Sequence, residues 1–177
     1  MIVNVYKEWV KLNENVLDVG CGNGIVSEYL EKGLGVKIRG CDIDNYLITK
    51  INFSKMKHPS KLPFKKNSFD SVMLNDVLHH TTKINQNKLL KEALRVGKKV
   101  LIFEIEPTLV SKVCDILINK IHYGSLKVPL TFRKIKDWEK LFRKMNFKYT
   151  SKQLRKPLLY PFKHTAFCVS SINSLKG

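Results

Sequence analysis

The sequence predicts an α/β fold, in which helices cover both faces of a mostly parallel sheet. Residues 15–24 have the pattern of a buried strand that runs into glycines at alternate positions. Residues 36–44 form a second apolar strand pattern, and its Asp42 lies 20 residues after Gly22. A strand, a glycine loop, a helix and a strand ending in a carboxylate make the nucleotide-binding unit of α/β sheets.

The residues in and around the glycine loop indicate which class of ligand it binds. Glycines allow positive φ and close approach of a ligand to the backbone. Asp18, two residues before Gly20, would repel a pyrophosphate at a helix N-terminus, but it suits a positively charged ligand. Ile25 stands where the dinucleotide fingerprint requires a small residue. Any βα turn of such a sheet can carry glycines, so the loop alone is weak evidence.

The rest of the chain alternates helical and strand patterns. In the first half we expect helices at 3–11, 25–32 and 46–51 and strands at 53–56 and 71–74. In the second half we expect helices at 85–96, 109–121 and 134–145 and strands at 99–105, 147–153 and 165–170. Thr82 or Asn85 can cap the helix that Gly97 stops, and Gly33 is expected just after the helix at 25–32, whose Val26, Tyr29 and Leu30 should face inward.

Composition predicts one domain over residues 1–177. There is no run of 18 apolar residues and no signal-peptide pattern, so we expect a cytoplasmic protein without a membrane span. The four cysteines form no C-x-x-C pair, which favours reduced, buried thiols and no structural metal site.

The formal net charge of +17 is unevenly distributed. Residues 1–106 hold 17 Lys and Arg against 12 Asp and Glu, whereas residues 107–177 hold 15 against 3. A lysine-rich composition explains part of this charge without any function. A basic surface that attracts an anionic partner explains its concentration in the second part of the chain.

Several ordered motifs between about residues 14 and 106 resemble those of class I S-adenosylmethionine (SAM)-dependent methyltransferases of the type 11 family. They are Val-Leu-Asp-Val-Gly-Cys-Gly-Asn-Gly at 16–24, Gly-Cys-Asp-Ile-Asp at 40–44, Leu-Pro-Phe at 62–64, Ser-Phe-Asp-Ser-Val at 68–72 and Leu-His-His at 78–80. The resemblance implies a Rossmann-like three-layer sandwich whose seven-stranded mixed sheet has its last strand antiparallel. It also implies that the protein is an enzyme that transfers a methyl group from SAM, and that residues 107–145 form a helical segment that covers the substrate.

The same resemblance implies which residues bind the cofactor. They are Asp18, Gly20, Cys21, Gly22, Gly24, Asp42, Ile43 and Asn75. The sequence departs from the family at His58, where relatives often carry an aspartate that contacts the adenine amino group. A backbone carbonyl or the His58 ring would have to replace that contact.

His79 and His80 are the candidate catalytic residues, since an imidazole with a pKa near 6.5 suits a general base. The alternative is that they are a structural pair at the start of a helix. Glu104, Glu106 and His122 are weaker candidates. Asp76, His79 and Glu104 would have to converge to bind a metal, and because spacing alone does not show this, we predict none.

The predicted acceptor is a small molecule. His122, Tyr123 and Arg133 lie in an acid-free stretch after the fifth strand, and they are the candidate substrate residues for an anionic acceptor. The Asn-Pro-Pro-aromatic motif of base and glutamine methylators is missing after the fourth strand, so nucleic acid is supported by charge only. A basic RNA or protein methyltransferase, and a SAM-binding partner protein without activity, stay open as alternatives, and the sequence predicts no oligomeric state.

Overall fold

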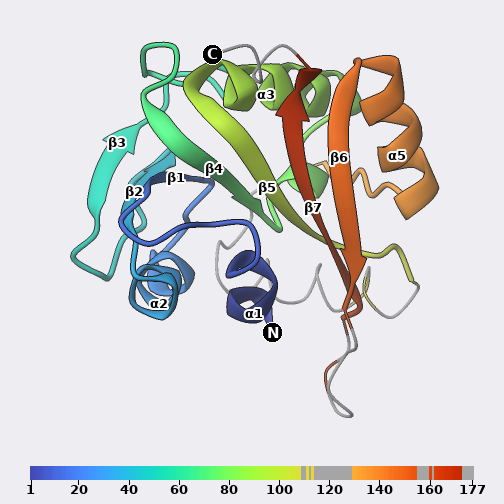
Figure 1. The fold of residues 1–177 in the computed structure, drawn as a ribbon. Helices are drawn as coiled ribbons and strands as arrows, with labels where there is room; N and C mark the ends of the chain where they lie inside the picture. Colours follow the sequence, from blue (N-terminus) through green and yellow to red (C-terminus); the bar gives the residue numbers. More distant parts are fainter. Residues whose placement is uncertain (109–110, 112, 114–128, 155–159, 161, 173–177) are drawn as a thin grey trace.

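The computed structural model describes residues 1–108, 111, 113, 129–154, 160 and 162–172 (Figure 1). Its elements are α1 (Ile2–Tyr6), β1 (Asn15–Val19), α2 (Ile25–Leu34), β2 (Lys37–Asp42), β3 (Asn52–Lys55), β4 (Phe69–Asn75), the 3₁₀ turn η1 (Leu78–His80), α3 (Lys83–Val96), β5 (Gly97–Ile105), α5 (Ile135–Lys144), β6 (Phe147–Gln153) and β7 (His164–Ser171). The helix expected over 109–121 lies outside the described residues.

The seven strands form one sheet in the order β3-β2-β1-β4-β5-β7-β6. Strands β1 to β5 pair in parallel, and β7 runs antiparallel to both β5 and β6. This confirms the predicted mixed sheet with an antiparallel last strand. The carboxyl ends of β1, β2, β4 and β5 consequently meet at one edge of the sheet, where parallel α/β sheets bind ligands.

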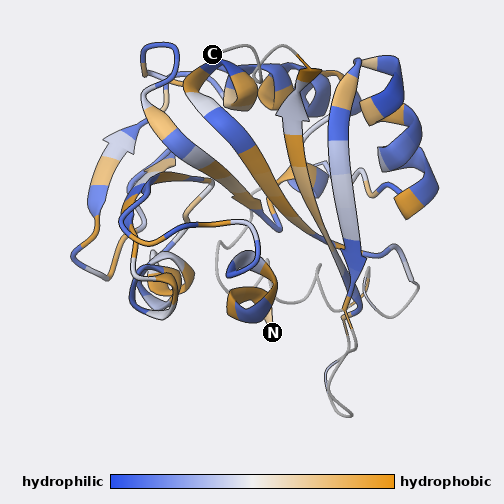
Figure 2. Ribbon diagram, in the orientation of Figure 1, coloured by the Kyte–Doolittle hydropathy of each residue, from blue (hydrophilic) through white to orange (hydrophobic). Residues whose placement is uncertain are grey.

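Two hydrophobic cores fill the space between the sheet and its helices. Helices α1 and α2 pack on one face of the sheet, and α3 and α5 pack on the other (Figure 1). Residues alternate between the two cores along the strands: Leu17 belongs to the α3 side, and Val16 belongs to the α2 side. Strands β4, β5 and β7 are the most hydrophobic, whereas the edge strand β6 is largely hydrophilic or neutral (Figure 2). The three-layer arrangement is therefore as predicted.

Helix α2 differs from its prediction in length and in orientation. It continues to Leu34, and Gly35, with φ of 65°, takes the left-handed cap position expected for Gly33. Val26 and Tyr29 are exposed, whereas Ser27 and Leu30 are buried. The predicted inner face was right for Leu30 but wrong for Val26 and Tyr29, because the helix turns Ser27 inward, where its hydroxyl donates to the buried carboxylate of Asp18.

Two other expected helices were also wrong. The helix predicted at 3–11 ends at Tyr6, and Leu12, expected on its inner side, is exposed. Residues 46–51 form no helix but an irregular segment between β2 and β3. Its Ile48 N–H donates to the carbonyl of Asn23, so this segment is fixed to the glycine loop and not to its own preceding turn.

The other boundaries agree with the predictions to within a few residues. Thr82 caps α3 by accepting a hydrogen bond from the Asn85 N–H, and Gly97 ends it. Trp138, Leu141 and Phe142 of α5 point into the core, as the helical spacing predicted. Within the described part of the chain, no helix combines the length and the apolar character needed to cross a membrane.

Candidate active site

The loop after β1 is the first element of the site. The backbone φ angles of Gly20, Gly22 and Gly24 are 73°, 52° and 81°, values that residues with a side chain rarely adopt. A Cβ on Gly20 would lie 2.3 Å from Val77 Cγ2. The Gly20 N–H donates to the carbonyl of Cys41, at 2.8 Å. The glycine turn thus ties the ends of β1 and β2 together at the ligand edge of the sheet.

Asp42, the last residue of β2, closes this corner. Its Oδ2 accepts a hydrogen bond from the Gly22 N–H at 3.0 Å, and its Oδ1 accepts one from the Ile43 N–H at 2.7 Å. Burial raises the pKa of Asp42, and the two backbone donors lower it. Each carboxylate oxygen keeps a further lone pair, so the side chain can still accept from two hydroxyl groups. Ile43 is 40% exposed and offers an apolar surface beside it.

Asp18 is a buried carboxylate, with 3% of its surface exposed. The Ser27 hydroxyl donates to its Oδ2 at 2.6 Å, and the Asn75 amide donates to its Oδ1 at 3.2 Å. Burial raises the pKa of Asp18 to about 6, against the two hydrogen bonds, and the charge of Asp42 raises it further. Among the described residues no Lys or Arg pairs with Asp18, so a positively charged ligand suits it best.

Tyr6 links the N-terminal helix to this site and was missed by the sequence analysis. Its hydroxyl donates to Asn75 Oδ1 at 2.7 Å, and the ring is fully buried. Burial raises the pKa of Tyr6 well above its ordinary value, and the charges of Asp18, Asp76 and Glu104 add to this. The two partners are 69 residues apart, and no local pattern in the sequence signals such a contact.

Cys21 and His58, which the sequence placed at the cofactor site, make contacts with other residues of the protein. The Cys21 sulfur packs against Gly40, since a Cβ added to Gly40 would lie 2.7 Å from Cys21 Sγ. Burial raises the pKa of the Cys21 thiol to about 12. His58 is exposed, and its Nδ1 accepts a hydrogen bond from the Ser60 N–H at 3.1 Å. A role of His58 in adenine recognition stays a prediction.

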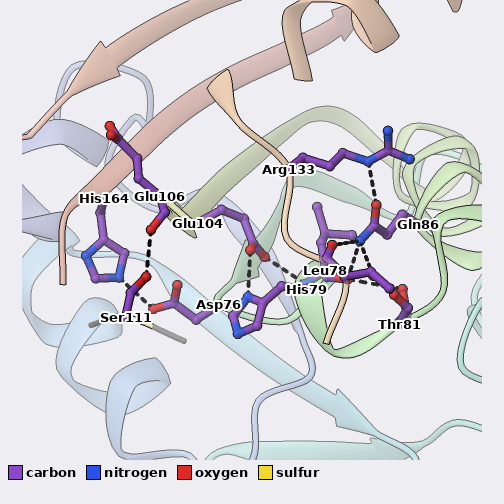
Figure 3. A network of polar contacts seen from close by, with 11 residues as sticks. Asp76, Leu78, His79, Thr81, Gln86, Glu104, Glu106, Ser111, Arg133 and His164 are labelled. Carbon is purple, nitrogen blue, oxygen red and sulfur yellow. Dashed lines mark hydrogen bonds and ion pairs between the residues drawn. The ribbon is translucent and has the colours of Figure 1, made fainter. Parts of the chain in front are cut away.

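The ends of β4 and β5 carry the candidate catalytic histidine. His79 Nδ1 lies 2.7 Å from Glu104 Oε2, and the Leu78 N–H donates to Glu104 Oε1 at 2.7 Å (Figure 3). The two side chains are 1% and 3% exposed. The rings of Phe132 and His80 lie 4.9 Å and 4.0 Å from the His79 ring. Burial raises the pKa of Glu104, while the neighbouring imidazole lowers it.

A second imidazole–carboxylate pair stands beside the first. Asp76 takes a left-handed φ of 49° where the chain leaves β4, and its Oδ2 lies 3.0 Å from Nε2 of the fully buried His164. The His164 ring stacks on Phe103, with 4.3 Å between ring centroids. The sequence analysis missed His164 because β7 was expected to begin one residue later. Only the antiparallel pairing of β5 with β7 brings it here.

A loop before α5 is fixed over this cluster by Gln86 of α3. The buried Gln86 amide donates to the carbonyls of Leu78 and Thr131, at 2.9 and 2.8 Å, and the Thr131 N–H donates to the carbonyl of His79 at 2.8 Å. Arg133 Nε donates to Gln86 Oε1 at 2.5 Å (Figure 3). The Gln86 side chain thus joins η1, α3 and the loop into one rigid unit.

The predicted substrate residues are only partly described. Arg133 lies in this loop, its guanidinium 5.2 Å from the Trp138 ring, with a further hydrogen bond to Asn87 at 3.3 Å. His122 and Tyr123 lie outside the described residues. A role of Arg133 in holding an acceptor stays a prediction.

A cavity of about 560 Å³ opens beside Phe132. Its lining includes two lysines and one acid, together with apolar side chains: Lys83, Pro107, Leu130, Thr131, Phe132, Lys134 and Asp137. Since Phe132 also stacks on His79, the cavity adjoins the histidine–carboxylate cluster. Its size is that of a pocket for a small molecule.

The comparisons with known proteins agree with this geometry. Residues 17–103 match the family model described as a methyltransferase domain. Two curated relatives match: the ribosomal protein L11 methyltransferase of Dictyoglomus turgidum, 26% identical over 146 residues (78% of this chain and 46% of the relative), and the sterol 24-C-methyltransferase of Kluyveromyces lactis, 36% identical over 87 residues (42% and 24%). The chain spans less than half the length of either.

Solved structures share the fold. The crystal structure of the Burkholderia thailandensis 1,6-didemethyltoxoflavin-N1-methyltransferase, which contains its acceptor and S-adenosylhomocysteine, has a TM-score of 0.68 with 14% identity, covering 96% of this chain and 76% of that one. A SAM-dependent methyltransferase from Aquifex aeolicus has a TM-score of 0.68 with 18% identity, covering 94% and 88%. At these identities the likeness concerns the fold.

Proposed function

The chain belongs to the class I SAM-dependent methyltransferases, and we propose that it binds SAM at the ends of β1, β2 and β4 and transfers its methyl group to a small molecule. The observation that carries this proposal is Asp18. It is a buried carboxylate whose pKa is raised to about 6, and it lacks a cationic partner among the described residues. The ammonium and sulfonium of SAM supply positive charge of the kind this site needs.

The polar and apolar side chains of the site match the groups of SAM that they would contact. Asp42 is placed to accept hydrogen bonds from two ribose hydroxyls, and Ile43 provides an apolar wall for a flat ring. Asn75 holds the Asp18 carboxylate from the side of β4. We therefore assign cofactor binding to the residues that the sequence predicted, with Tyr6 as a further residue that orients Asn75.

When bound, SAM would supply an electrophilic methyl group: a lone pair of the acceptor would form a bond to the methyl carbon as the C–S bond opposite it breaks, and S-adenosylhomocysteine would leave. The protein contributes alignment and a dry site. Phe132 covers His79 and excludes water from the acceptor side, and Gln86 fixes the loop that carries Phe132. A proton released from the acceptor passes to an imidazole, for which His79 and His80 are the predicted groups.

The cavity beside Phe132 supports a small acceptor with negative charge. Lys83 and Lys134 bring two positive charges to its lining, against the single acid Asp137. Arg133 lies next to Lys134 and is the predicted residue that binds a carboxylate or phosphate of the acceptor. A ribosomal protein is the acceptor named for one curated relative and a sterol is named for the other, so relatives do not select the class.

The test is methyl transfer from labelled SAM to a cell extract separated into small-molecule, RNA and protein fractions. We expect label in the small-molecule fraction, and less label with Asp42→Asn at a SAM concentration below the wild-type Kd. Label in RNA or protein would show that the acceptor is a macromolecule and not a small molecule. The basic second part of the chain would then be the surface expected to bind it. No label in any fraction, with SAM still bound, would make the chain a SAM-binding partner protein.

A further inference from the structure

One imidazole and two carboxylates converge where β4 and β5 end, at a position for which the sequence predicted no metal. Each of Asp76, His79 and Glu104 offers one ligand atom, and the three atoms lie within 4.8 Å of one another. We propose that these three side chains bind a divalent transition-metal ion, a site separate from the SAM-binding residues.

The spacing of the three groups matches that of ligands around one ion. Metal–nitrogen and metal–oxygen bonds are about 2.0 to 2.2 Å long, so neighbouring ligand atoms lie about 3 Å apart. His79 Nδ1 and Glu104 Oε2 are 2.7 Å apart, and both side chains are almost fully buried. A small closing movement of Asp76 brings the third ligand into the same sphere, because its atom is already within 4.8 Å of the other two.

The neighbours of the three residues hold them in ligand orientation. The Leu78 N–H donates to Glu104 Oε1, so Oε2 is the oxygen that faces His79, and an ion held by Oε2 and His79 Nδ1 would replace the contact that now joins these two atoms. His164 lies on the other side of Asp76 and contacts its Oδ2 (Figure 3). The remaining oxygen, Asp76 Oδ1, is enclosed and accepts no hydrogen bond from the described residues. Such outer contacts are typical of metal ligands and fix their direction.

Charge balance also favours a cation. Within the described ranges, no Lys or Arg forms an ion pair with Asp76 or Glu104, although the whole chain carries a formal charge of +17. Two carboxylates so close together are costly to ionise unless positive charge lies between them. The mixed nitrogen and oxygen set suits Zn²⁺, Mn²⁺ or Fe²⁺ better than Ca²⁺ or Mg²⁺, which prefer oxygen alone.

An ion here would face the acceptor side. The Phe132 ring separates the cluster from the cavity only by its own thickness, since it stacks on His79 and lines the cavity. If the proposed methyl transfer holds, the ion would bind an anionic oxygen of the acceptor and lower the pKa of a hydroxyl nucleophile. His79 would then be a ligand, and His80 would be the imidazole left to take the proton.

Metal binding can be tested without any activity. The protein is treated with chelator, dialysed and titrated with ZnCl₂ and MnCl₂ by calorimetry, and Co²⁺ binding is followed by its visible absorption. We expect one ion per chain, and a loss of affinity of at least about tenfold in both Glu104→Gln and Asp76→Asn. Glu106→Gln is the matched control, because this acid on the same strand end binds Thr165 and Lys163 instead, and its affinity should not change.

Two outcomes overturn the proposal: no saturable binding to the wild-type chain, or equal affinity in the wild type, Glu104→Gln and Asp76→Asn. SAM titration of the same variants serves as the folding check, since the proposed SAM contacts at Asp18, Asp42 and the loop glycines lie on β1, β2 and the loop between β1 and α2, away from the substituted side chains. Normal SAM binding without metal binding would refute the metal site and leave the proposed function intact. Metal binding without SAM binding would do the reverse.

Discussion

The ligand edge of the sheet has two halves that are built differently. In the half formed by β1 and β2, the carboxylates bind mainly backbone N–H groups and one nearby hydroxyl: Asp42 accepts from Gly22 and Ile43, and Asp18 accepts from Ser27 and, across the sheet, from Asn75, 57 residues away. In the half formed by β4, β5 and β7, the partners are distant. His79 is 25 residues from Glu104, and Asp76 is 88 residues from His164.

This difference decides what each half can be. The first half uses mainly backbone donors and glycines, which a short motif encodes, and apart from the contact of Asp18 with Asn75 on β4 it forms within β1, α2 and β2. The second half consists of side-chain pairs that exist only once the whole sheet has assembled. We therefore expect substitutions in the second half to affect stability first, and substitutions in the first half to affect SAM binding first.

The largest expected effect is that of Glu104→Ala in metal-free protein. The change removes the partner of buried His79 and the acceptor of the Leu78 N–H, which should lower the free energy of unfolding by about 3 kcal/mol or more. Urea unfolding followed by circular dichroism measures it. Glu106→Ala, the partly exposed control, should lose less than about 1 kcal/mol. Equal losses would mean that the buried contacts of Glu104 with His79 and Leu78 contribute no more to stability than the partly exposed contacts of Glu106.

Asp18→Asn should act on stability and binding in opposite directions. The carboxyl has a pKa of about 6 in the folded protein and about 4 in the unfolded chain, so the folded state holds its proton more tightly. Its contribution to stability therefore falls as pH rises from about 4 to 6. The amide removes that loss, so the free protein at pH 7 should gain up to about 2 kcal/mol while SAM binding is lost. If the free energy of unfolding depends on pH between 4 and 6 in the same way in Asp18→Asn as in the wild type, the assignment of this pH dependence to Asp18 is contradicted.

Asp42→Asn should weaken SAM binding with little change in the unfolding of the free protein. An amide can accept only one of the two ribose hydrogen bonds, which corresponds to a rise in Kd of about tenfold or more. Calorimetric titration measures the change. Asp44→Asn is the control, since this exposed acid pairs with Lys55, and its Kd should match the wild type.

The smallest effect is expected for Arg133→Ala. Loss of the hydrogen bond to Gln86 and of the contact with Trp138 should cost about 1 kcal/mol of stability. The SAM affinity should stay the same, and the KM of an anionic acceptor should rise. Lys136→Ala, an exposed cation three residues further along in α5, is the comparison, and an acceptor KM that responds equally to both changes would mean that Arg133 has no specific role.

The sequence was sufficient for the sheet and its antiparallel last strand, whereas the cofactor role of the first half stays a prediction. Glycine spacing and the carboxylate after β2 are local signals, and they led to Asp18 and Asp42. Tyr6 and His164 could not be found in this way, since their partners are set by packing between distant elements. The helix predicted at 46–51 was wrong for the same reason, since a backbone N–H of this segment bonds to the glycine loop, which is distant in the sequence.

The central claim is that the carboxylates of the first half select a positively charged cofactor. Calorimetric titration of the wild-type chain with SAM and, separately, with NAD tests it most directly. SAM should bind at one site per chain, and NAD should give no heat of binding, because Asp18 would repel its pyrophosphate. Binding of NAD without binding of SAM would contradict the claim and return the glycine loop to the dinucleotide class.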